Sequence, residues 1–201
     1  MPVIESPESA LAVLAEGNAR FASGHPQHPN TSRAHTARSL TDPPTPVAIV
    51  LSCIDSRVPV ERVFDLGVGD LFVVRVAGNV ATTGVVGSIE LALGSGCPVI
   101  VVMGHTGCLA VGTACAGGLR SRAVRSLTGP IREEAERVRM MTPGIGDEEF
   151  LRHVEQANVH RSMADLMNAS DDVRSAVETG RVALVGAVYE TDAGRVRWLN
   201  G

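Results

Sequence analysis

Two short clusters of polar residues, about fifty positions apart, carry side chains that commonly bind metal ions. Cys53 and Asp55 are separated by one residue, and His105 and Cys108 by two. Either spacing suits a tight loop, and a glycine before His105 and another before Cys108 let the second loop turn freely. Thiolate, imidazole and carboxylate are ligands that zinc takes in tetrahedral sites. The sequence therefore predicts a zinc site if the two clusters meet in the fold.

Other functions of these residues are less well supported by the sequence. Cys53 followed by Arg57 resembles a phosphatase loop, but the three intervening residues are too few to ring a phosphate with backbone amides. The chain contains no Lys, which excludes a glycine-rich phosphate loop ending in Lys-Ser/Thr. Cys97 and Cys115 lack neighbouring ligand residues, so we expect ordinary packing roles for them.

Apolar runs typical of buried strands precede both clusters. Residues 47–51 lead into the first cluster and residues 98–103 into the second. In open α/β sheets, sites form beyond the carboxyl ends of the strands. We expect the four candidate side chains to converge if these two strands are neighbours.

The rest of the chain alternates between strand and helix patterns. Further strands are predicted over 71–76, 182–189 and 195–199, the last pairing as a hairpin. Helical patterns cover 6–23, 59–65, 84–94, 119–141 and 147–178. This order predicts an α/β fold with a mainly parallel central sheet flanked by helices and a short antiparallel edge strand at the C-terminus.

Length and composition indicate one domain over residues 1–201, with an N-terminal helix and arm over 1–46 and an α/β core over 47–201. The arm from 24 to 46 is long for a structureless segment, which suggests that it wraps a partner subunit. The net charge of −4 lacks the excess of basic residues that is typical of nucleic-acid-binding proteins, so we expect no nucleic-acid partner. Apolar runs of about 18 residues and a signal-peptide pattern are both lacking, so we expect a cytoplasmic protein that binds no membrane.

The two clusters together, Cys-Ile-Asp-Ser-Arg at 53–57 and Gly-His-Thr-Gly-Cys at 104–108, resemble the paired zinc motif of β-class carbonic anhydrases. The similarity extends over most of the chain, with further matching segments at 16–21, 69–79, 87–90 and 188–189, and at Gly194. The combination is far more specific than either cluster alone.

The resemblance implies reversible hydration of carbon dioxide to bicarbonate and a proton by a hydroxide on Zn²⁺. Cys53, His105 and Cys108 would be permanent ligands of the zinc. Asp55 would be a variable fourth ligand, which either binds zinc or turns to Arg57 and leaves the fourth position to water. Asp55 and Arg57 are therefore the expected catalytic residues.

The resemblance also implies a substrate pocket and an assembly. Phe72, Ala77 and Gly104 are the candidate pocket residues for carbon dioxide or bicarbonate. The family works as a dimer with sites near the subunit boundary and N-terminal helices that cross between subunits, so we expect a homodimer or a higher homo-oligomer.

Four positions depart from the family pattern or bear on its subgroups. Leu109 replaces a glycine, Pro44 a glutamine and Leu91 an aromatic residue, which leaves pocket shape and substrate choice open. Val50 replaces the tryptophan of members that bind inhibitory bicarbonate, so we expect no such regulation. The alternatives are a hydrolase of carbonyl sulfide or carbon disulfide from the same family, and a non-catalytic protein with a closed structural zinc site.

Overall fold

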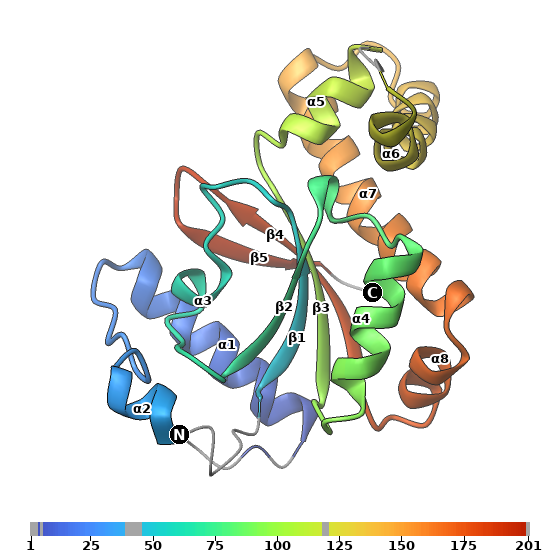
Figure 1. The fold of residues 1–201 in the computed structure, drawn as a ribbon. Coiled ribbons are helices and arrows are strands. Elements are labelled where there is room, and N and C mark those ends of the chain that lie inside the picture. The colour runs from blue at the N-terminus through green and yellow to red at the C-terminus, as the bar shows by residue number, and fades with distance from the viewer. Residues whose placement is uncertain (1–3, 5, 39–45, 118–120, 200–201) are drawn as a thin grey trace.

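A five-stranded sheet forms the centre of the computed structural model, which describes residues 4, 6–38, 46–117 and 121–199 (Figure 1). Its strand order is β2-β1-β3-β4-β5, and all neighbours are parallel except β4 and β5. The mainly parallel sheet with an antiparallel C-terminal edge is the predicted fold class, which the structure confirms. The strands are β1 (Ala48–Ser52), β2 (Leu71–Arg75), β3 (Val99–His105), β4 (Ala183–Glu190) and β5 (Arg195–Leu199).

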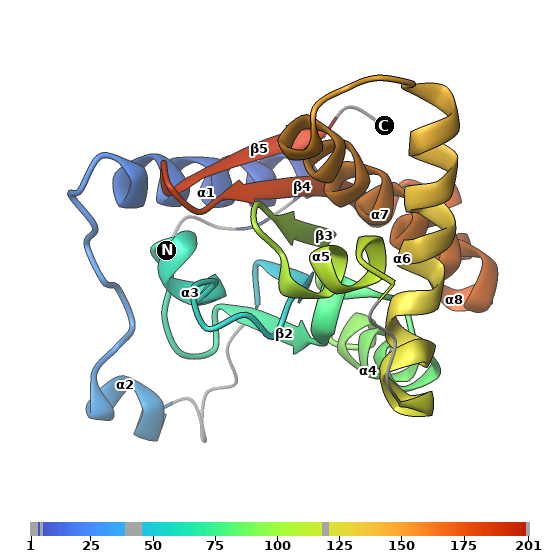
Figure 2. The same cartoon turned by 90° about the horizontal axis from the view of Figure 1, so that it is seen from above.

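Alternating side chains of the sheet are covered by helices on both faces. Val50 and Val101 face the helices α1 (Pro7–Ala22) and α3 (Val60–Val63). Ile49 and Ile100 face the opposite layer, which consists of α4 (Thr83–Leu93), α7 (Asp147–Ala169) and α8 (Asp171–Glu178). Because both faces are covered, β1 and β3 are buried along their whole length, which explains their unbroken apolar sequences. Figure 2 shows the two layers on either side of the sheet.

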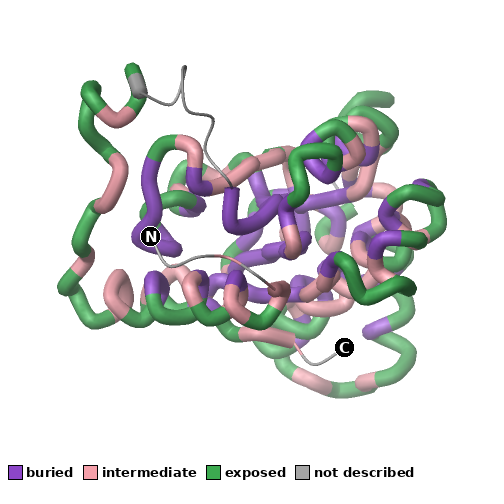
Figure 3. Tube along the Cα trace, turned by 90° about the horizontal axis from the view of Figure 1, so that it is seen from below, coloured by how far each residue is buried: buried purple, intermediate pink, exposed green. Residues whose placement is uncertain are grey.

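A third apolar cluster lies beyond the carboxyl ends of the strands. It is built from α5 (Leu109–Cys115), α6 (Arg122–Met141) and the first half of α7, and it includes the side chains of Cys53 and Cys108. Ile131 of α6 and Val154 of α7 are fully buried there. Figure 3 shows buried segments through the middle of the molecule and exposed segments around its edge. Cys53 and Cys108, one from each of the two predicted polar clusters, thus lie at the base of a small helical cap.

Several elements differ from the expectations. Helix α5 was not predicted, because its small and β-branched residues give only a weak helical pattern. Helix α2 (Arg33–Arg38), which lies within the arm, was not predicted either. Strand β3 runs on to His105, two residues further than predicted. The single helical pattern over 147–178 is interrupted at Ser170, whose hydroxyl caps α8 by accepting a hydrogen bond from Val173 N. The first residues of the helix predicted over 119–141 lie outside the described part of the chain.

Helix α1 packs against β5 and α3 of the same chain. Ser6 and Ser9 form a capping box at its start, and Ala10 and Leu14 are fully buried. Within the described residues, no helix is both long and apolar enough to cross a membrane.

Replacing Asn18 with alanine is expected to lower the free energy of unfolding by about 3 kcal/mol. The buried Asn18 amide donates to the carbonyls of Val63 at 2.9 Å and Gly194 at 3.0 Å, and accepts from Val196 N at 2.8 Å. Denaturant unfolding at fixed protein concentration measures the change. Glu16→Ala, on the exposed face of the same helix, is the control. Equal stabilities of the two variants would show that Asn18 does not fasten α1 to the sheet.

Candidate metal centre

The two polar clusters meet because β1 and β3 are adjacent and parallel. Cys53 follows β1, His105 is the last residue of β3, and Cys108 is the N-cap of α5. The Sγ atoms of Cys53 and Cys108 are 3.9 Å apart. One ligand atom from each of Cys53, His105 and Cys108 lies within 4.8 Å of the others, and all three residues are buried. The convergence at one edge of the sheet follows the expectation from the sequence.

The chemistry of these atoms fits a tetrahedral metal ion. A carbonyl oxygen can only accept, so the 3.0 Å contact between His105 Nδ1 and Thr106 O places a proton on Nδ1. Nε2 is buried and has no hydrogen-bond partner among the described residues, so its lone pair is left for a ligand bond. Zinc–sulfur bonds of about 2.3 Å at tetrahedral angles put two sulfurs about 3.8 Å apart. The observed sulfur separation therefore suits zinc without rearrangement.

The pKa values of the two thiols are shifted in opposite directions. The hydrogen bond with Cys108 lowers the pKa of Cys53 to about 4, and the same contact raises the pKa of Cys108. The Gly78 amide also donates to Cys53 Sγ at 3.4 Å, which further favours the thiolate. A thiolate is the form of cysteine that binds metal ions. The surroundings of Cys53 thus favour the thiolate form, which can bind a metal ion.

Asp55 forms a bidentate ion pair with Arg57. The Nε and Nη2 atoms of Arg57 donate to the two carboxylate oxygens at 3.0 and 2.7 Å, and Arg57 N donates to Oδ1 at 2.9 Å. These hydrogen bonds hold the pKa of Asp55 well below its usual range. Asp55 Oδ2 nevertheless lies only 3.9 Å from His105 Nε2. The carboxylate therefore borders the Cys-His-Cys cluster while it is paired with Arg57.

Two arginines connect the loops around the cluster. Arg57 Nη2 donates to the Gly107 carbonyl at 2.9 Å, which ties the first loop to the second. Arg75, at the end of β2, donates to the carbonyls of Cys53 at 2.8 Å and Asp55 at 2.5 Å. Arg75 was not among the predicted site residues. The feature of the sequence that could have identified Arg75 is its position as the one charged residue at the end of an otherwise apolar strand.

A pocket of about 990 Å³ opens in front of the cluster, and most of its wall is apolar. Ala77, one of the predicted substrate-pocket residues, lines this pocket. Leu109 also lines it and is 78% exposed, so this side chain stands at the rim. Phe72 packs instead with the cluster under α4, and Gly104 lies beneath α7, where an added Cβ would come within 2.8 Å of Val159. Neither of these two residues is among those lining the pocket.

Other singled-out residues lie elsewhere. Val50 is fully buried in the sheet, Leu91 is exposed on α4, and Cys97 is buried under the sheet. Cys115 is half-buried at the end of α5. Pro44 falls outside the described residues.

The sheet and its edge cluster define an α/β protein with a Cys₂His metal centre at the carboxyl ends of parallel strands. A family model described as carbonic anhydrase matches residues 48–196. Carbonic anhydrase 2 of Mycobacterium tuberculosis is 41% identical over 199 residues, covering 94% of this chain and 91% of the relative. Carbonic anhydrase of Mycolicibacterium smegmatis is 40% identical over 197 residues, covering 95% and 92%.

Solved structures share the fold. A tetrameric β-carbonic anhydrase of Sordaria macrospora aligns with a TM-score of 0.77 at 22% identity, covering 96% of this chain and 98% of that one. The Coccomyxa β-carbonic anhydrase in complex with acetazolamide gives 0.73 at 21% identity, covering 94% and 86%. The chain belongs to the β-class carbonic anhydrase family.

Replacing Cys53 with serine is expected to reduce the bound metal from about one ion per chain to less than about a tenth, because three-point binding loses a thiolate. Elemental analysis after extensive dialysis measures the stoichiometry. Cys97→Ser is the matched control, since Cys97 is equally buried but packs in an apolar cluster away from the metal centre, with its Sγ 3.6 Å from the Pro46 carbonyl. Full metal content in Cys53→Ser would contradict the site.

Proposed function

We propose that this carbonic anhydrase interconverts carbon dioxide and bicarbonate with a zinc ion held by Cys53, His105 and Cys108. The observation that carries the proposal is a three-ligand cluster whose nearby carboxylate, Asp55, is paired with Arg57. Structural zinc sites have four protein ligands, whereas catalytic sites keep one position open. The family match and the two mycobacterial relatives support the reaction.

The chemistry that zinc supplies when bound is a water molecule whose pKa falls to about 7. The residues of the chain position that water. Asp55, held by Arg57 and 3.9 Å from the imidazole nitrogen, presents a carboxylate that can accept a hydrogen bond from the reacting O–H. An oriented O–H leaves a lone pair of the oxygen directed at the substrate. Arg57 keeps the carboxylate in this place by a charge-assisted pair.

Carbon dioxide is small, uncharged and apolar, so it needs a dry wall more than hydrogen-bonding groups. Ala77, Ala110 and Leu127 supply such a wall in the pocket in front of the cluster. Excluding water from this space also strengthens the electrostatic interactions of the charged groups around it. The pocket therefore combines apolar binding with one oriented polar partner.

A homo-oligomer is part of the proposal. Ile54, Leu109 and Val124 are exposed large hydrophobic side chains, and all three line the pocket mouth. Exposed apolar groups gathered in this way are typical of a surface that another chain covers. The fungal structural neighbour described as tetrameric is consistent with this assembly. Light scattering on the purified protein tests it, and a fully active monomer would contradict it.

A second candidate function is hydrolysis of carbonyl sulfide or carbon disulfide, which are also linear molecules. Leu109 at the pocket rim favours it, because small changes in an apolar pocket alter discrimination between similar substrates. Turnover on carbon dioxide and on carbon disulfide, measured under the same conditions, separates the two functions. Zinc content without turnover of either substrate would instead indicate a structural site.

Replacing Asp55 with asparagine is expected to lower kcat/KM for carbon dioxide hydration about 100-fold, because a neutral amide orients the reacting water less well and cannot pair with Arg57 as an ion. Metal content should stay near one ion per chain, since the Cys-His-Cys set is intact. Stopped-flow hydration and elemental analysis on the same samples measure both quantities. Unchanged turnover would remove Asp55 from the mechanism.

Replacing Arg57 with glutamine is expected to lower activity at least tenfold while zinc is retained or bound more tightly. Without the guanidinium, the Asp55 carboxylate, whose Oδ2 lies 3.9 Å from His105 Nε2, is free to turn toward the Cys-His-Cys cluster and close the open side. Arg132→Gln, which removes an exposed ion pair on α6, is the control. Equal activity of both variants would show that Arg57 does not hold the site open.

A further inference from the structure

Helix α7 reaches the back of the metal centre, on the side away from the apolar pocket. Glu155 of α7 is only 5% exposed, and its Oε1 accepts a hydrogen bond from the backbone amide of Cys108 at 3.1 Å. Burial raises the pKa of this carboxyl group, although the amides of Cys108 and Gly107 act in the opposite direction. A buried acid is costly unless it is hydrogen-bonded, so the contact with the metal loop explains its presence.

A second contact from α7 reaches the other sulfur ligand. Asn158 is 1% exposed, and its Nδ2 donates to the Gly78 carbonyl at 2.7 Å. The amide of Gly78 in turn donates to Cys53 Sγ at 3.4 Å. Gly78 has a positive φ of 69°, and an added Cβ would lie 2.6 Å from Ile131 Cδ1. The backbone of Gly78, which contacts the sulfur, is therefore held by the hydrogen bond from Asn158 and by close packing against Ile131.

Asn158 also carries an unfavourable feature. Its Oδ1 is buried and has no hydrogen-bond partner within the described residues. An unpaired buried amide oxygen costs roughly 1–3 kcal/mol, so packing alone does not account for an asparagine here. The contact of Nδ2 with Gly78 does account for it.

We infer that Glu155 and Asn158 are positioning residues that hold the Cys108 and Cys53 sulfurs at metal-binding separation. The inference deepens the proposed function and rests on its metal centre. The two residues are three positions apart, so they share one face of α7. Each fixes one of two loops that are distant in the chain, and the rigid helix sets the distance between them. Groups of this kind commonly change metal affinity 10- to 100-fold when they are removed.

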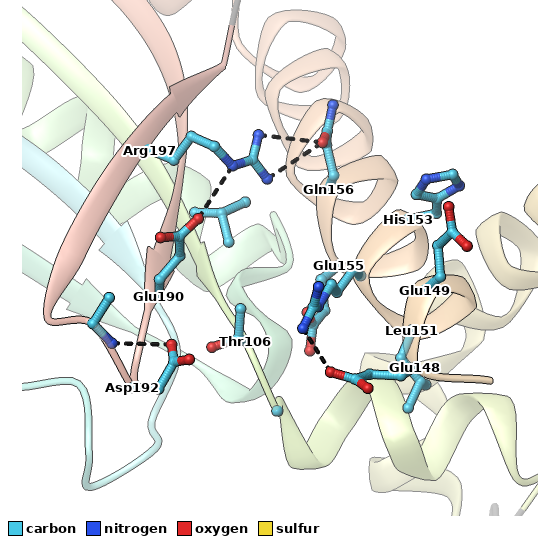
Figure 4. A pocket seen from close by; sticks show the side chains of 14 residues that line it. Thr106, Glu148, Glu149, Leu151, His153, Glu155, Gln156, Glu190, Asp192 and Arg197 are labelled. Atoms are coloured by element: carbon cyan, nitrogen blue, oxygen red, sulfur yellow. Dashed lines mark hydrogen bonds and ion pairs between the residues drawn. The ribbon is translucent and has the colours of Figure 1, made fainter. Parts of the chain in front are cut away.

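A pocket of about 770 Å³ is lined in part by Glu155. In Figure 4, Glu155 projects from α7, across the pocket from Glu190 and Arg197 of the two C-terminal strands. A glutamine at this position keeps an acceptor oxygen for the Cys108 amide and has room for its amide group toward the pocket. Glu155→Gln is therefore the conservative variant, and Glu155→Ala removes the contact.

Zinc affinity, measured by competition with a chromophoric chelator, is the readout, and it requires no turnover. Glu155→Ala and Asn158→Ala should each bind zinc about 10- to 100-fold more weakly than the wild type. Glu155→Gln should stay within about threefold of the wild type. Ser162→Ala, at a buried polar position one turn beyond Asn158 on α7, should match the wild type. Unfolding midpoints of the metal-free proteins report any general loosening of the helix.

Wild-type affinity in both alanine variants would overturn the inference, and so would an equal loss in Ser162→Ala. If Glu155→Ala does not fold, Glu155→Asp replaces it. This variant keeps the charge but withdraws the carboxylate from Cys108 N, so weakened binding is expected and unchanged binding would refute the role. A wild type that binds zinc tightly without hydrating carbon dioxide refutes the proposed function alone. A wild type that binds no zinc refutes both.

Discussion

Two buried sulfur atoms held 3.9 Å apart are the constraint on which the rest of the site depends. The hydrogen bond between these sulfurs lowers the pKa of Cys53 and raises the pKa of Cys108. Nε2 of His105 lies beside them, buried and without a hydrogen-bond partner among the described residues. A buried imidazole nitrogen without a hydrogen-bond partner costs free energy, and a bound cation relieves that cost. The fold therefore keeps an arrangement that only a ligand can satisfy.

Parallel pairing of β1 with β3 brings the three residues together. It places the ends of two strands about fifty residues apart in the chain at one edge, and the register fixes their relative height. The covering helices supply the burial that makes the register unique, since a shift by one residue would turn the apolar side chains of one face to the other. The position of the metal centre thus follows from packing of the sheet core.

Much of this arrangement could be predicted from the sequence because the signals were local. Unbroken apolar runs indicated the buried strands, and the short ligand spacings indicated the centre. Helix α5 was missed because Leu109–Cys115 is short and rich in small residues, and packing under α6 and α7 stabilises it more than its own propensity does. Arg75, Glu155 and Asn158 were not identified, because each acts through backbone groups that are 22 to 80 residues away in the chain. Contacts with backbone carbonyls and amides leave no spacing pattern.

The loop that carries His105 and Cys108 has an apolar pocket on one side and a pocket lined by many charged residues on the other. Gly107 of this loop lies between the two pockets. Gly107 lines both the apolar pocket in front of the cluster and the polar pocket behind it. Its φ of 68° is the reason for glycine there, since an added Cβ would meet only Arg57 atoms, 3.7 Å or more away. Its carbonyl accepts from Arg57 on the front, while the next amide, of Cys108, donates to Glu155 on the back. Both hydrogen bonds come from the one peptide group that joins Gly107 to Cys108, whose C=O and N–H point in opposite directions because the peptide bond is trans. One loop of four residues can then be fixed from the substrate side and from the helix side at once.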